Sequence, residues 1–135
     1  MFLPDGRLLF HSEFADKESE ISIADVDGRN IIHLTDNNAE EWDAKVSPDG
    51  KHIAFTSNRD GDHEIYVMNI DGTDQKQLTN NDVGDFGPTW SPDGSQIVFQ
   101  SERDGQTNLY IMNKDGSSTK QLVSDGWQPT WFVGR

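Results

Sequence analysis

Three acidic segments, each leading to an aromatic residue, carry the side chains best suited to binding chemistry. They cover residues 36–43 (DNNAEEWD) and 80–86 (NNDVGDF) and, in a shorter form, 124–127 (SDGW). Clustered carboxylate and amide oxygens suit a hard cation such as Ca²⁺, and aromatic side chains beside carboxylates suit a protein or basic peptide. The sequence therefore predicts a site for a ligand or partner, with Asp43 and Asp85 as candidate calcium ligands. Its predicted residues are Glu40, Glu41, Trp42, Asp43, Asp82, Asp85, Phe86, Asp125 and Trp127.

The other reactive residue types give no sign of catalysis. His11, His33, His52 and His63 share neither a common position nor the spacing of metal ligands, so we interpret them as surface residues. The chain contains no Gly-x-Ser-x-Gly nucleophile elbow and no Gly-Lys-Ser/Thr phosphate loop. It has no cysteine, which excludes disulfides and thiolate chemistry. We therefore expect no catalytic residues and no cofactor apart from the candidate calcium ion.

The charge balance narrows the choice of partner. There are 24 acidic residues against 11 basic ones, for a formal net charge of −13. Nucleic acid and anionic membranes are unfavourable partners because phosphate binding needs clustered Lys and Arg. The plainest interpretation is a solvated acidic surface, and the sharper one is a face for a basic protein segment or a cation. No run of about 18 apolar residues predicts a membrane span, and residues 1–10 show no signal-peptide pattern.

The acidic segments recur because the whole chain repeats itself every 44 residues. Pro-Asp-Gly occurs at residues 4–6, 48–50 and 92–94, and Asp-Gly occurs at 27–28, 71–72 and 115–116. A period of roughly 40–45 residues with strand-like content is typical of β-propeller blades. We therefore expect one supersecondary unit copied side by side. Three such units are too few to close a ring.

The second repeat shows the expected blade most clearly. Alternating apolar and polar residues predict strands over 51–57 and 64–69, a short polar strand over 76–79, and a fourth strand over 88–91. Asp-Gly pairs supply the positive φ of the hairpin turns. We expect alternating apolar side chains to be buried between blades and one leucine to anchor each outer strand. The predicted core residues are Ile53, Phe55, Ile65, Val67, Ile97, Phe99, Leu109 and Ile111, and the anchors are Leu34, Leu78 and Leu122.

One run of residues resembles the TolB-type, WD40-like β-propeller repeat. It reads Trp90-Ser91-Pro92-Asp93-Gly94, then Ile97-Val98-Phe99, Leu109-Tyr110-Ile111-Met112-Asn113 and Gln121-Leu122, and it is largely repeated 44 residues earlier. The resemblance covers essentially the whole chain. It implies an all-β fold of three four-stranded antiparallel blades around a central channel. In this family, similar repeats form a six-bladed ring that recruits a lipoprotein partner, or the propeller half of prolyl-oligopeptidase-like peptidases.

The resemblance also predicts how the chain assembles. We expect one domain over residues 1–135, with repeats of about 3–46, 47–90 and 91–132. The first repeat lacks the innermost strand before Pro-Asp-Gly, whereas residues 128–132 supply such a strand with no blade after it. Two chains could then form a six-bladed homodimer in which each C-terminal strand completes the partner's first blade. The alternative is a fragment of a longer gene product. The predicted interface residues are Phe2, Leu8, Phe10, Gln128, Trp131 and Phe132.

Three functions stay open from the sequence. The first is a non-enzymatic scaffold that assembles into a ring and binds a protein or peptide at the channel face. The second is a detached propeller that gates or supports a peptidase, and the third is a metal-assisted enzyme for a small molecule or carbohydrate in the channel. The aromatic residues of the predicted site have an alternative role as wedges between blades. A TolB-like chain would be periplasmic, and otherwise we expect a cytoplasmic one.

Overall fold

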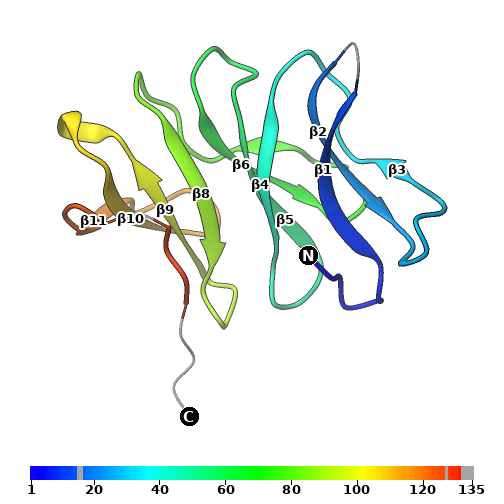
Figure 1. Cartoon of the computed structure of the whole chain (residues 1–135). Coiled ribbons are helices and arrows are strands. Elements are labelled where there is room, and N and C mark those ends of the chain that lie inside the picture. Colours follow the sequence, from blue (N-terminus) through cyan, green and yellow to red (C-terminus); the bar gives the residue numbers. More distant parts are fainter. Residues whose placement is uncertain (15–16, 127, 132–135) are drawn as a thin grey trace.

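The computed structural model describes residues 1–126 apart from 15 and 16, and residues 128–131. Its strands form three antiparallel sheets that stand side by side (Figure 1). The first sheet contains β1 (Leu8–Phe14), β2 (Lys17–Ala24) and β3 (Ile32–His33). The second contains β4 (Glu41–Val46), β5 (His52–Ser57), β6 (Glu64–Asn69) and β7 (Lys76–Gln77). The third contains β8 (Asp85–Trp90), β9 (Gln96–Ser101), β10 (Asn108–Asn113) and β11 (Lys120–Val123), with a 3₁₀ turn, η1 (Arg103–Gly105), before β10. The all-β prediction is confirmed.

The second and third sheets have the four strands predicted for a blade, but the first sheet has three. The place inside β1 is filled only at one end, where Phe2 pairs with Leu8 and the Leu9 amide donates to the Met1 carbonyl at 2.8 Å. Four strands are thus confirmed for the second and third blades, and the first blade lacks its innermost strand, as the sequence analysis expected.

The repeated Pro-Asp-Gly turns are held by the aspartate side chain. Asp93 Oδ1 accepts hydrogen bonds from the Ser91 hydroxyl at 2.7 Å and from the Ser95 amide at 3.0 Å. These bonds stabilise the carboxylate, and they lower the pKa of Asp93 to about 2. Gly94 has a φ of +70°, which a residue with a Cβ rarely adopts. The same contacts recur at Asp49, so the turns predicted from the repeat are confirmed.

The core lies between the sheets, so the middle blade is buried on both faces. Ile53 and Phe55 pack toward the first sheet in one cluster. Ala54 and Ile65 pack toward the third sheet in a second cluster with Ile97 and Phe99. Trp90 also belongs to the second cluster, and its Nε1 donates to the Lys45 carbonyl at 3.0 Å. The predicted burial of Ile53, Phe55, Ile97 and Phe99 is confirmed. In β6 and β10 the core also takes in Tyr66, Met68, Tyr110 and Met112, which were not predicted as core residues.

The leucine anchors of the three outer strands differ in burial. Leu34 is 6% exposed, Leu78 is partly buried, and Leu122 is 50% exposed. The prediction for Leu122 is therefore wrong. The backbones of Leu34 and Leu78 are each covered by an Asp-Gly turn of the next blade: a Cβ added at Gly72 would lie 2.9 Å from the Leu34 carbonyl oxygen, and one at Gly116 would lie 2.8 Å from that of Leu78. Burial here comes from the neighbouring blade. Val67 and Leu109, predicted as core, are only partly buried.

Candidate partner-binding site

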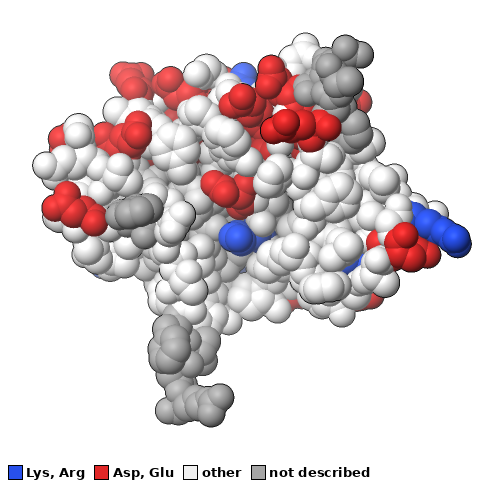
Figure 2. Space-filling view, viewed as in Figure 1, with Lys and Arg blue, Asp and Glu red and all other residues white. Residues whose placement is uncertain are grey.

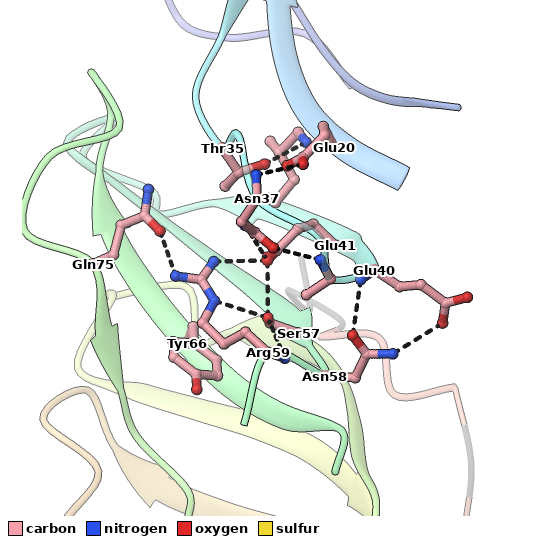
Figure 3. A network of polar contacts seen from close by, with 12 residues as sticks. Glu20, Thr35, Asn37, Glu40, Glu41, Ser57, Asn58, Arg59, Tyr66 and Gln75 are labelled. Atoms are coloured by element: carbon pink, nitrogen blue, oxygen red, sulfur yellow. Dashed lines mark hydrogen bonds and ion pairs between the residues drawn. The ribbon is translucent and has the colours of Figure 1, made fainter. Parts of the chain in front are cut away.

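A buried carboxylate begins the innermost strand of the second blade (Figure 3). Glu41 is fully buried, and its Oε1 accepts hydrogen bonds from Asn37 Nδ2 at 2.9 Å, the Ser57 hydroxyl at 2.9 Å and Arg59 Nη2 at 2.8 Å. Burial nevertheless raises the pKa of Glu41, because removing the charge from water outweighs these bonds. The cluster ties the acidic segment before β4 to the loop after β5.

The third blade repeats this arrangement with a shorter carboxylate. Asp85 is fully buried, and its Oδ2 accepts from Asn81 Nδ2 at 2.8 Å and from Arg103 Nη2 at 3.0 Å. The Arg103 guanidinium lies 4.8 Å from the centre of the Tyr110 ring, just as that of Arg59 lies 4.7 Å from Tyr66. Two of the predicted site residues, Glu41 and Asp85, are therefore turned inward to hold arginines.

Three aromatic rings stack across the junction between the second and third blades. The rings of Trp42 and His63 are 5.1 Å apart and nearly parallel, and the His63 ring is 5.0 Å from the Phe86 ring, tilted against it by 36°. His63 Nε2 is also 3.8 Å from Glu40 Oε2. The structure thus brings together three predicted site residues, Glu40, Trp42 and Phe86. They meet around His63, which the sequence analysis interpreted as a surface residue.

A hollow of about 570 Å³ opens beside this stack. Its lining comes from the β5–β6 loop, the segment before β8 and the loop that contains η1. The lining residues are Gly61, Asp62, His63, Asp82, Val83, Gly84, Phe86, Glu102, Gly105, Gln106 and Thr107. Asp82 and Phe86 are predicted site residues, whereas the other carboxylates, Asp62 and Glu102, were not singled out.

The hollow lies on the acidic edge of the molecule. Asp and Glu side chains gather along the edge from which the β5–β6 loop and η1 project (Figure 2). Among the predicted site residues, Asp43, Asp82 and Asp125 are exposed, and Glu40 is partly exposed. Trp127 and the predicted interface residue Phe132 lie outside the described residues. The acidic edge can therefore present carboxylates to a cationic partner.

The two candidate calcium ligands do not meet at one point of this edge. Asp43 is exposed on a bulge of β4 with a φ of +53°, whereas Asp85 is buried at the start of β8. In the described part of the chain, no group of three or more His, Cys, Asp or Glu side chains could hold a metal ion. A calcium ion at the channel mouth stays a prediction.

Sequence reasoning missed Arg59, Arg103 and His63. The arginines had a signal, because Ser-x-Arg occurs at residues 57–59 and again at 101–103, in the repeat period. His63 had a weaker signal, since it stands one residue before β6, at the same end of the blade as Trp42 near the start of β4. Within the residues that the structure describes, no helix is long and apolar enough to cross a membrane.

Sheets ordered radially from an innermost strand, with repeated turns and carboxylate clusters, define blades of a β-propeller. The chain belongs to the TolB β-propeller domain family, whose model matches residues 1–131. It is similar to a putative TolB from Agrobacterium tumefaciens, with 26% identity and a TM-score of 0.79 over 91% of this chain and 48% of that one. For TolB from Acinetobacter baumannii the identity is 27% and the TM-score 0.78, over 91% of this chain and 31% of that one.

The chain thus spans about half, or less, of the length of these TolB structures. A third similar structure is that of the tricorn protease, with 23% identity and a TM-score of 0.62 over 84% of this chain and 10% of that one. At this identity the likeness shows the fold alone. No curated protein matches the chain.

Proposed function

We propose that the chain is a non-enzymatic scaffold that binds a protein or peptide of positive charge along its acidic edge. The observation that carries this proposal is the hollow beside Phe86, which joins an aromatic floor to the carboxylates of Asp62, Asp82 and Glu102. The two arginines of the same loops, Arg59 and Arg103, are already paired with buried carboxylates. The edge therefore offers negative charge that its own cations do not cancel.

A charge reversal tests this proposal. We expect immobilised chain to retain Lys- and Arg-rich peptides of an array over neutral and acidic ones, and to release them as salt rises. The double variant Asp62→Lys, Asp82→Lys should lose this preference, while Asp27→Lys in a turn of the first repeat should keep it. Equal binding of acidic and basic peptides by the unmodified chain would contradict the proposal. A TolB-like role also implies a periplasmic location, which cell fractionation tests.

No comparable observation favours the alternative function, a propeller that gates or supports a peptidase. Peptidases such as the tricorn protease and puromycin hydrolase share the fold at 23% and 18% identity. Such likeness does not carry a function to this chain. A channel enzyme would need reactive side chains near one another, and the acidic groups at the start of β4 and β8 are bonded to arginines.

The proposal includes assembly into a six-bladed ring by two chains. Trp131 Nε1 donates to the Thr89 carbonyl at 3.4 Å, which repeats the contact between Trp90 Nε1 and the Lys45 carbonyl. Residues 128–131 thus lie against β8 as β8 lies against β4. Phe2, 68% exposed, lines the same inner hollow of about 470 Å³ as Trp131. A strand of the partner would complete the innermost position beside β1.

The contacts of Leu8 and Leu9 limit where a partner strand could pair with β1. Met1 and Phe2 already pair with this end of β1, so a partner strand has to displace them or pair only beyond them. Of the other predicted interface residues, Phe10 is partly buried and Gln128 is exposed. We expect removal of residues 1 and 2 to strengthen association, because it frees the competing backbone groups.

Solution mass tests the assembly. Light scattering at micromolar concentration should give about 30 kDa, twice the 15.2 kDa chain. A chain cut after Ser124 should become monomeric or aggregate. A mass of one chain for the unmodified protein would overturn the homodimer, and the missing blades would then have to come from a further part of a longer chain.

A further inference from the structure

The hollow beside Phe86 has a counterpart in the second blade, and there the chain fills it. Trp42 and Phe86 are equivalent residues 44 positions apart, and so are His63 and Thr107. In the second blade, the His63 imidazole covers the face of Trp42 at 5.1 Å. In the third blade, the smaller Thr107 stands at the corresponding place and lines the hollow with Phe86.

A second pair of equivalent residues widens the difference. Glu40 accompanies His63 in the second blade, with 3.8 Å between the carboxylate and the imidazole nitrogen. Its equivalent in the third blade is Gly84, which has no side chain to occupy the hollow. A Cβ at Gly84 would lie 2.3 Å from the Phe86 ring, so the ring lies directly against this backbone. The third blade therefore keeps the aromatic residue and lacks equivalents of these two side chains. His63 of the second blade packs against Phe86 at 5.0 Å, with the rings tilted by 36°, and lines the hollow together with it.

We propose that this hollow binds the guanidinium group of an arginine side chain from the partner. The proposal rests on the proposed function and names the chemical group that the acidic edge recognises. The guanidinium would lie on Phe86 as the planar His63 ring lies on Trp42. It would replace, from outside, the planar nitrogen-bearing group that the second blade supplies itself.

The charge of the hollow suits such a group. Asp62, Asp82 and Glu102 are exposed on its walls, and none of the three forms an ion pair with another described residue. Because they come from three different loops, they surround the hollow without converging on one point. That layout fits a flat cation with donors in several directions better than a metal ion, which needs its ligands close together.

The chain shows the same recognition twice in its interior. The Arg59 guanidinium lies 4.7 Å from the centre of the Tyr66 ring and 2.8 Å from a Glu41 carboxylate oxygen. Arg103 repeats this with Tyr110 and Asp85. An aromatic face next to a carboxylate attracts a guanidinium through the ring quadrupole and charge-assisted hydrogen bonds. The hollow offers the same two components to a group from solution.

Amide chemical shifts of the whole chain, titrated with acetyl-Gly-Arg-Gly-amide, test the inference. We expect saturable shifts at Gly84, Phe86 and Thr107, weaker ones with the lysine peptide, and none with the isosteric, uncharged citrulline peptide. Thr107→His should fill the hollow as His63 fills its counterpart. It should weaken the binding of the arginine peptide at least tenfold, with the remaining spectrum unchanged. Asp82→Asn should weaken this binding several-fold. Asp115→Asn, an equal charge change in a distant turn, should leave binding intact.

The outcomes separate this inference from the proposed function. Shifts spread over other parts of the acidic edge would overturn the arginine site, while the proposal of a cationic partner would stand. Equal binding of the arginine and citrulline peptides would also overturn it, and so would full binding by Thr107→His. If Ca²⁺ alone gave the same saturable shifts and displaced the peptide, the hollow would be a metal site, and the inference would fail.

Discussion

The segments that lead into the innermost strands are fastened in two different ways. Before β4, Glu20 Oε1 accepts the Asn37 amide at 2.7 Å, and before β8, Glu64 Oε1 accepts the Asn81 amide at 2.7 Å. The equivalent residue in the third blade is Asn108, whose Oδ1 accepts the Asp125 amide at 3.0 Å. The third segment is also three residues shorter, and it has no counterpart of the buried Glu41 or Asp85 clusters among the described residues.

The difference lies in the strength of the hydrogen bonds that hold each junction. A carboxylate is a stronger acceptor than a neutral amide, and each of the first two segments is also tied to an arginine of the following blade. Residues 128–131 are held against β8 by the longer bonds of Trp131 and Thr89. The first two junctions are thus held by stronger acceptors than the third. In the assembly proposed above, the third junction is the one at which a strand of another blade would take part.

The largest effect should come from comparing the leucine anchors of the first and third outer strands. Leu34→Ala removes a side chain that is buried under the next blade, and it should cost about 3 kcal/mol of unfolding free energy. Leu122→Ala should cost less than about 0.5 kcal/mol, because Leu122 is half-exposed. Urea denaturation with both variants measures the difference. A large loss at Leu122 would mean that a further blade covers β11 in solution, which would sharpen the assembly model.

A smaller difference in unfolding free energy should separate the carboxylate acceptor from the amide acceptor. Glu64→Ala removes the acceptor of both the Asn81 amide and the Thr79 hydroxyl, and it should cost about 2 kcal/mol. Asn108→Ala removes one neutral bond and should cost about 1 kcal/mol. The midpoints of urea unfolding, with equal slopes, give the comparison. If both variants lose the same stability, the carboxylate is no better a fastening than the amide, and the contrast between the junctions fails.

The sequence predicted the features that repeat and missed those that depend on a neighbour. Strands, turns and the phase of Ile53 and Phe55 follow from alternation and from Asp-Gly spacing, and all were found. Leu122 was misjudged because its burial depends on the turn of another blade, which periodicity within one repeat does not report. His63 was overlooked for the same kind of reason, since its two ring partners come from β4 and β8.

The smallest effect concerns pH, and it contrasts a buried fastening with an exposed turn. Burial raises the pKa of Glu64 above the usual 4.5, so the folded state is penalised as pH rises and this carboxylate must ionise. The melting temperature of Glu64→Gln, relative to the unmodified chain, should therefore rise between pH 4 and 7.

The contribution of Asp93 to stability depends on pH with the opposite sign, because its hydrogen bonds lower its pKa from 3.8 to about 2. Its stabilisation is present above pH 3.8 and is lost as pH falls toward 2, so Asp93→Asn should gain on the unmodified chain only in that acid range. Parallel curves for the two variants would show that neither carboxylate is held as the structure places it, and the contrast between a desolvated fastening and a solvated turn would have to be abandoned.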